Sequence, residues 1–477
     1  MADLQTKNQH LMWRAGFGPS AAQLDYLPKI SSSALYAALK KSSSGKPEYI
    51  DVADNYLKGL FMGAGEIGRQ QRQQMNVAEK KKQREQNRDD IKSLNLAWLD
   101  EMVHSEAQLR EKMAFFWHGH FASRNLNIFY QQQLLDIIRE NALGSFRTLL
   151  HEASKSAAIL NFLNAQQNRK DHPNENFARE VMELFTLGRG HYSEHDVKEA
   201  ARAFTGWGAN AKGEFVFRKF QHDTGNKTVL GYTGRLVGED VLDLLLEQKQ
   251  TAFFITEKIY RFFVNEITDT EKVKWLSTRF YESDYNIEKL MDDIFSSTWF
   301  YEDKNIGKKI KSPIELLVGI QRMLPMKLQE PESLLVIQRL LGQLLFYPPN
   351  VAGWPSGKAW IDSSILMMRL RIPQLLTSND NLDIQPKTDD DQMMGKNDAI
   401  NRKGRSGKII KTEIDWNQVS DHFSRFSNDS VQYVIVKGLL QVPMKSPAIL
   451  KKDTFNKDHN IKLAFIQIMS LPEYQLC

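Results

Sequence analysis

Histidine, the side chain most often used as a metal ligand and as a general acid or base, is unevenly distributed in this chain. Of the 11 histidines, eight lie between residues 104 and 222. Carboxylates run through the same segment, notably Glu175, Glu180, Glu183 and Asp223. Imidazoles and carboxylates together can hold a divalent metal ion or transfer protons, so this segment is where we expect chemistry to take place.

The stretch FFWHGHFAS, residues 115–123, places His118 and His120 on either side of Gly119. On a continuous helix these two imidazoles would point about 200° apart and could not share an ion. Glycine permits a helix to break, and the residues that follow are typical of a loop. We therefore expect a helix that ends near Gly119, with both imidazoles facing one cavity. The alternative is that both histidines are buried and hydrogen-bonded among their aromatic neighbours.

A second segment, DHPNENFAREVMELFTLGRG at residues 171–190, predicts a helix that ends at Gly188. Glu180 and Glu183 are three residues apart, so they lie on one face of this helix. The apolar residues around Glu183 indicate that at least one of these acids is drawn toward the interior, where a carboxylate needs a partner. The alternative is that Arg179 pairs with Glu175 and reaches Glu183, so that the acids only form ion pairs on the helix surface.

A third segment, FQHDTGNKTVLG at residues 220–231, contains His222, Asp223 and Lys227 around a glycine. Neighbouring side chains point apart in regular structure, so His222 and Asp223 cannot act as a dyad by themselves. The polar composition predicts a loop, whose groups would bind an anion or complete a metal shell. The alternative is an ordinary surface turn.

These three segments together lead to the hypothesis of a metal-dependent enzyme, most simply a hydrolase, with Zn, Mn or Fe as the ion. The metal would activate water or polarise an ester oxygen, a glutamate would act as base, and a lysine would neutralise an anionic group of the substrate. The expected metal ligands are His118, His120, Glu180 and Asp223, and the expected catalytic residues are Glu183, His222 and Lys227.

Helices must position these groups, because helical spacing dominates the sequence. In SPIELLVGIQRML, for example, Ser312 is a helix cap, Pro313 occupies the first helical position, and Glu315 completes a capping box. Strand signals are few; residues 213–220 alternate weakly and suggest a short hairpin arm. The pattern predicts a mainly α protein, with a single large multi-helical domain, few short strands and long irregular loops.

Changes in composition divide the chain further. Residues 1–375 are expected to form the main helical domain, with a charged helix or arm at 65–92. Residues 376–413 are polar and predict a surface loop or linker. Residues 414–477 predict a C-terminal helical segment that packs on the main domain.

Composition also excludes several classes of protein. Cys477 is the only cysteine, so disulfides within the chain and cysteine metal clusters are excluded. The net charge of +5 is weak for a nucleic-acid-binding protein, and we expect no nucleic-acid partner. The N-terminus lacks the pattern of a signal peptide, which by default predicts a cytoplasmic location. No apolar run is long enough for a transmembrane helix.

Six sequence segments together resemble a bacterial family catalogued as domain of unknown function 1800. They occur in that family's order across about residues 8–370. The segments are HLMWRAGFGPS, LREKMAFFWHGHFA, HPNENFAREVMELFTLGRGHYSEHDVKEAARAFTGW, QHDTGNKTVLG, KSPIELLVG and LLGQLLFYPPNVAGWPSGKAWIDSS.

The resemblance implies no established activity. It implies a bacterial protein, and many relatives carry export signals and are encoded beside a sulfatase-like family. The alternative to an enzyme is therefore a non-catalytic helical binding or assembly protein that acts with a sulfatase-like partner. Many relatives have histidine where this chain has Phe185, so position 185 is left out of the expected site. In the last segment, Trp354 and Trp360 are expected either to form an apolar or sugar-stacking wall or to pin their loop to the core.

Overall fold

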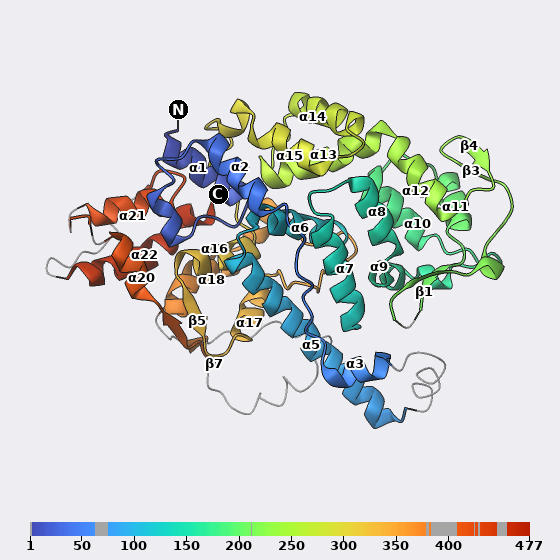
Figure 1. Cartoon of the computed structure of the whole chain (residues 1–477), viewed down its shortest axis with the longest axis horizontal. Coiled ribbons are helices and arrows are strands. Elements are labelled where there is room, and N and C mark those ends of the chain that lie inside the picture. The colour runs from blue at the N-terminus through green and yellow to red at the C-terminus, as the bar shows by residue number, and fades with distance from the viewer. Residues whose placement is uncertain are drawn as a thin grey trace.

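The fold is that of a mainly α protein, as the sequence predicts. A computed structural model of the chain describes residues 2–62, 75–210, 212–377, 381–382, 408–423, 425–427, 430–445 and 456–477. Its buried apolar side chains form one continuous core that runs from the first helix to the last. Helices from distant parts of the chain pack against one another to form one large helical domain (Figure 1).

The N-terminal half supplies the helices that carry the predicted site. Helix α5 crosses the molecule diagonally, and α6 and α7 pack beside it (Figure 1). The helices are α1 (Leu4–Arg14), α2 (Ser32–Ser42), α3 (Asn55–Met62), α5 (Val77–His104), α6 (Gln108–His120), α7 (Ile128–Glu140), α8 (Phe146–Lys155), α9 (Ala157–Phe162), α10 (Asn176–Glu180) and α11 (Glu194–Ala203).

The C-terminal half continues the helical packing. Helices α13 and α14 pack closely against each other, and α21 packs on α22 near the N-terminal helix (Figure 1). The helices are α12 (Gly238–Glu247), α13 (Lys249–Phe263), α14 (Thr270–Glu282), α15 (Ile287–Phe295), α16 (Pro313–Met323), α17 (Ser333–Leu340), α18 (Ser363–Thr377), α20 (Trp416–Phe423), α21 (Val431–Leu439) and α22 (Lys457–Met469).

Strands are short and form four two-stranded antiparallel sheets in the described parts of the chain. The predicted hairpin arm within 213–220 is confirmed, since its central residues Phe215–Phe217 pair with Trp207–Ala209. The pairs are β1 (Trp207–Ala209) with β2 (Phe215–Phe217), β3 (Lys227–Val229) with β4 (Tyr232–Gly234), β5 (Met326–Leu328) with β8 (Thr412–Ile414), and β6 (Asn381–Leu382) with β7 (Lys408–Ile409).

Local sequence signals explain where several helices begin. The hydroxyl of Ser312 accepts a hydrogen bond from the Glu315 backbone, and the Glu315 carboxylate accepts one from the Ser312 backbone, so the predicted capping box of α16 is confirmed. The segment 171–190 differs from a single α-helix: α10 ends at Glu180 and continues as a π-helical turn, Val181–Thr186. Gly188 then adopts a positive φ of 80° and ends the segment, as predicted.

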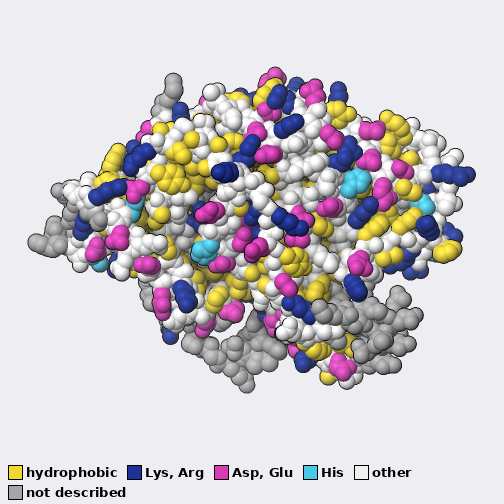
Figure 2. Space-filling view, in the orientation of Figure 1, with side chains coloured by type: hydrophobic (Ala, Val, Ile, Leu, Met, Phe, Trp, Pro, Cys, Tyr) yellow, Lys and Arg dark blue, Asp and Glu magenta, His cyan; other side chains and the backbone are white. Residues whose placement is uncertain are grey.

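The charged and polar stretches are described only in part. Residues 77–92 of the charged segment form the first half of α5, whereas residues 63–74 lie outside the described residues. Most of the expected linker 376–413 lies outside them too. On the face seen in Figure 2, basic and acidic side chains are interspersed. Among the described helices, none is long and apolar enough to cross a membrane.

Candidate functional site

Helix α6 carries His118 and His120, and it ends one residue beyond Gly119. Both side chains are buried, each with 3% of its surface exposed. Because the helix continues through Gly119, the two imidazoles leave it on different sides. His118 lies among Trp98, Phe346 and Trp354, whereas His120 lies among other aromatic rings, including Phe146 and Phe185.

The contacts of His118 are those of a neutral core residue. Its Nε2 accepts a hydrogen bond of 3.3 Å from the backbone N–H of Phe346. Burial lowers the pKa of His118 to about 3, so the ring stays uncharged. Its ring centroid is 5.2 Å from that of Trp354, which links the end of α6 to the loop that carries this tryptophan.

His120 forms a pair with Lys258 of α13. Nζ of Lys258 lies 2.9 Å from Nδ1 of His120. Burial, together with the charge of Lys258, lowers the pKa of His120 well below its usual value, so the imidazole is neutral. Burial also lowers the pKa of Lys258 to about 8. The pair therefore contains a neutral acceptor and an amine whose protonation changes near neutral pH.

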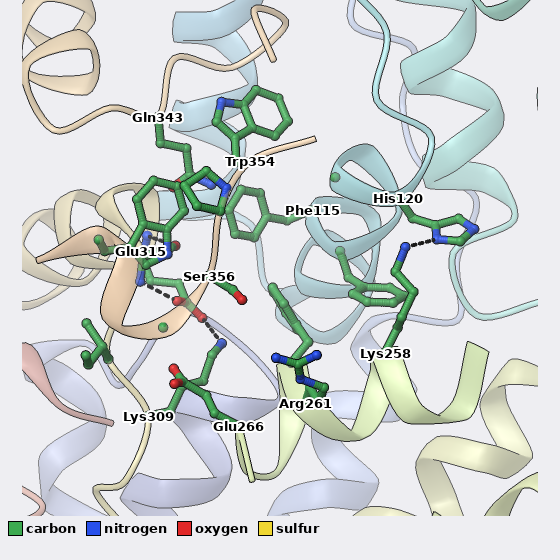
Figure 3. A pocket seen from close by; sticks show the side chains of 18 of the residues that line it. Phe115, His120, Lys258, Arg261, Glu266, Lys309, Glu315, Gln343, Trp354 and Ser356 are labelled. Atoms are coloured by element: carbon green, nitrogen blue, oxygen red, sulfur yellow. Dashed lines mark hydrogen bonds and ion pairs between the residues drawn. The ribbon is translucent and has the colours of Figure 1, made fainter. Parts of the chain in front are cut away.

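A cavity of about 220 Å³ opens beside this pair. Its wall is built by segments far apart in the sequence: the end of α6, the end of α13, the start of α16 and the loop 352–360 (Figure 3). Three of these four stretches belong to the segments that carry the family resemblance. The lining includes Phe115, Phe116, His120, Lys258, Arg261, Phe262, Glu266, Lys309, Glu315, Gln343, Trp354, Ser356 and Trp360.

One wall of the cavity is a buried ion cluster. Glu315 is fully buried and pairs with Lys112, and Lys309 lies 3.1 Å from the same carboxylate (Figure 3). Burial disfavours the charged carboxylate, but Lys112 and Lys309 outweigh burial, and the pKa of Glu315 is lowered. Burial also lowers the pKa of Lys112 to about 8. This wall therefore keeps a fixed carboxylate covered by two ammonium groups.

The mouth of the cavity carries charged groups with unused binding capacity. Oε1 of Glu266 is buried and has no hydrogen-bond partner among the described residues. The guanidinium of Arg261 is exposed, and among those residues it has neither a hydrogen bond nor an ion pair. Gly357 lies against the Glu266 carboxylate with a φ of 59°, and a β-carbon there would overlap the carboxylate. Both the close approach and the backbone conformation therefore require glycine.

The predicted pair Glu180 and Glu183 lies at the junction of α10 and the π-helical turn. Burial and the charge of Glu183 raise the pKa of Glu180. Glu183 accepts a hydrogen bond of 2.5 Å from the Tyr192 hydroxyl. Arg179 pairs with Glu175, as the surface alternative expects, and also with Glu194. The two predicted acids are thus neighbours, and both are half-buried.

Local contacts fix the predicted group: His222 and Asp223 to the end of α11 and the residues after it, and Lys227 to its own loop. Nδ1 of His222 lies 3.0 Å from the Thr205 carbonyl, and Asp223 forms an ion pair of 2.8 Å with Arg202. Hydrogen bonds from Arg202, more than any other cause, lower the pKa of Asp223. Lys227 Nζ donates to the carbonyl oxygens of Asp223 and Gly225, at 2.5 Å and 3.0 Å.

The structure thus brings the predicted residues together in part. Glu180 lies near Glu183 and Asp223 near Lys227, but His118, His120 and Asp223 contact three different sets of neighbours. Across the described residues, no group of three or more His, Asp, Glu or Cys side chains is arranged to hold an ion. Metal binding stays a prediction.

Sequence reasoning missed Lys258, Arg261 and Glu266. The usable signal was weak: Lys258, Arg261 and Phe262 share one helix face by their spacing of three and four residues, which places two cations beside an aromatic ring. Phe185, where many relatives have histidine, lies against His120 with ring centroids 5.9 Å apart.

The family assignment rests on nearly the whole chain. The family described as "Protein of unknown function (DUF1800)" matches residues 10–476. The chain therefore belongs to this family. No curated protein and no solved structure matches it significantly.

Proposed function

We propose that this chain is an enzyme that binds a small molecule in the cavity beside α6 and α13 and transfers protons to and from it, with hydrolysis as the reaction class. The observation that carries the proposal is the Lys258–His120 pair, with its 2.9 Å contact, inside a cavity to which three of the segments that carry the family resemblance contribute. A shifted pKa on a lysine in a cleft is typical of catalytic sites, because burial tunes the amine toward the working pH.

The chemistry follows from the two protonation states of Lys258. As a neutral amine it takes a proton from water or from a substrate hydroxyl group. As an ammonium group it gives a proton to the departing oxygen. His120 is neutral and accepts from Lys258 through Nδ1, so it fixes the position of the amine. Arg261 and Lys309 line the same cavity and would stabilise negative charge that develops on the substrate.

The test is a direct measurement of the Lys258 pKa. Protein grown with lysine labelled with ¹³C at Cε is titrated by NMR, and the Lys258 signal is assigned by its loss in Lys258→Met. We expect a midpoint near pH 8, with the signals of exposed lysines such as Lys41 as internal controls. Turnover of chromogenic esters, phosphates and glycosides should follow the same midpoint and disappear in Lys258→Met.

An ordinary midpoint for Lys258 would overturn the proposal and favour the alternative, a non-catalytic binding protein. The sulfatase-like partner and the metal ion stay separate predictions. Neither is needed for the proton transfer assigned to Lys258.

A further inference from the structure

Two groups at the mouth of the cavity, the Glu266 carboxylate and the Arg261 guanidinium, are available to bind a ligand. Oε1 of Glu266 is buried without a hydrogen bond, which costs free energy unless a bound molecule donates to it. The Arg261 guanidinium lines the same opening, pairs with none of the described residues and is suited to an anionic group. The hydroxyl of Ser356 also points into the cavity (Figure 3). A ligand that matches this opening carries both hydroxyl groups and a negative charge.

Aromatic rings form much of the remaining lining. Trp354, Trp360 and Phe262 line the cavity together with Phe115 and Phe116. The ring of Trp354 is held by His118, so it is pre-positioned as a wall. Flat aromatic walls among hydrogen-bonding groups suit a ligand with apolar C–H faces and polar edges, as a pyranose ring has. The cavity of about 220 Å³ has room for one such ring with its substituents.

We propose that the cavity binds an acidic sugar, a pyranose ring that carries a carboxylate, phosphate or sulfate group. Arg261 binds the anionic group, Glu266 and Ser356 bind hydroxyl groups, and the Trp354 ring packs on the C–H face. Three cations line the cavity, Lys258, Arg261 and Lys309, against two carboxylates, Glu266 and Glu315. Lys309 pairs with Glu315, so Lys258 and Arg261 face the single remaining carboxylate, Glu266. The charge balance therefore favours an anionic ring over a neutral one. This inference rests on the proposed function and names its substrate class.

The test compares four probes by calorimetry and by saturation-transfer NMR: glucuronate, glucose 6-phosphate, neutral glucose, and cyclohexanecarboxylate, a ring acid without hydroxyl groups. We expect both acidic sugars to bind about ten-fold more tightly than glucose, which corresponds to one charge-assisted contact of about 1.4 kcal/mol. They should also bind more tightly than cyclohexanecarboxylate, because only a hydroxyl group satisfies Glu266.

Variants of exposed or polar residues identify the contacts without threatening the fold. Arg261→Gln should remove the preference for the acidic sugars and leave glucose binding unchanged, whereas Arg235→Gln, at an exposed arginine near β4, should change nothing. Glu266→Gln should weaken neutral glucose, because an amide oxygen is a poorer acceptor than a carboxylate, and should not weaken cyclohexanecarboxylate, which brings no hydroxyl group.

Three results would overturn the inference: no saturable binding of either acidic sugar, equal binding of glucose and glucuronate, or tighter binding of cyclohexanecarboxylate. A Lys258 midpoint near 8 together with any of them leaves the proposed function standing and rejects only the acidic sugar.

Discussion

At the scale of single residues, the most informative feature is Lys258, whose buried ammonium group reduces the stability of the fold. Burial lowers the pKa of Lys258 to about 8, from an ordinary value of 10.5. Because the amine binds its proton less tightly in the folded than in the unfolded chain, its charged form opposes folding. Side chains that reduce stability in a cleft are typical of functional sites, where activity and stability are in conflict.

This cost predicts the effect of Lys258→Met on stability. At pH 7 the pKa difference of about 2.5 units opposes folding of the wild type by about 3 kcal/mol. Loss of the hydrogen bond to His120 destabilises the variant by about 1 kcal/mol. The variant should therefore be more stable than the wild type by about 2 kcal/mol. The folded chain releases this proton first, so wild-type stability rises between pH 8 and 10.5 and the advantage of the variant shrinks over the same interval. Urea unfolding at several pH values measures this difference.

The control for this experiment is Lys41→Met, at an exposed lysine near the end of α2. It should change stability by less than about 0.5 kcal/mol at every pH. A Lys258→Met variant that is less stable than wild type at pH 7, or whose effect does not depend on pH, would contradict the shifted pKa.

At the scale of elements, the loop 352–360 and the end of α6 fix each other. Gly353 has a φ of 83°, and a β-carbon on it would overlap the carbonyl oxygen of Gly119 in the last turn of α6. The loop can approach the helix so closely only because residue 353 has no side chain. This contact places Trp354 against His118 and so sets the position of the aromatic wall.

Gly353→Ala is therefore expected to destabilise the chain by about 2–4 kcal/mol, which combines backbone strain of about 1 kcal/mol with a backbone clash. Gly342 offers a matched control, since it has the same φ of 83° but open space around its missing β-carbon. Gly342→Ala should cost only the strain, about 1 kcal/mol. Thermal unfolding followed by circular dichroism measures both. Equal losses for the two variants would show that the contact with Gly119 has no energetic role.

The same elements show what sequence patterns can and cannot predict. The cap at Ser312, the hairpin at 215–217 and the helix end near Gly119 follow from local rules, and the structure confirms them. The π-helical turn does not follow from local rules. It spans only six residues, and a single turn of this length is too short to reveal a different period in the apolar pattern.

The candidate site is only partly predictable from the sequence, because its residues meet only through tertiary packing. His120 was chosen for its residue type, and it does line the cavity. Its partner Lys258 lies 138 residues further along the chain on an ordinary amphipathic helix, and only tertiary packing brings the two together. The aromatic wall was expected as one of two alternatives for Trp354 and Trp360, and both residues line the cavity.

At the scale of the whole molecule, the first helix contacts the last residues of the chain. The side-chain amide of Gln9 in α1 donates to the carbonyl groups of Lys437 and Gly438 in α21. Arg14 donates to the carbonyl groups of Asn305 and Cys477, and the backbones of Lys309 and Cys477 exchange two hydrogen bonds. The backbone of Lys309, in the cavity wall, is thus bonded to Cys477. That residues 414–477 form a helical segment packing on the main domain stays a prediction.

Metal dependence requires distant segments of the chain to converge. Ligands of one ion must meet at bond lengths of about 2 Å. His118 would have to release the Phe346 N–H, and Asp223 would have to release Arg202. Glu180 needs less change, since burial and repulsion from Glu183 already raise its pKa and a cation would relieve both effects.

If these segments do hold an ion, protein purified without a histidine tag should carry about one equivalent of Zn, Mn or Fe. Elemental analysis should show that His118→Ala combined with Glu180→Ala removes it. Removing the ion with a chelator should also lower the melting temperature of wild type but not of the double variant, because only a native site links metal to folding. Sub-stoichiometric metal that the double substitution leaves unchanged would contradict metal dependence. It would leave the proton transfer assigned to Lys258 as the chemistry of this chain.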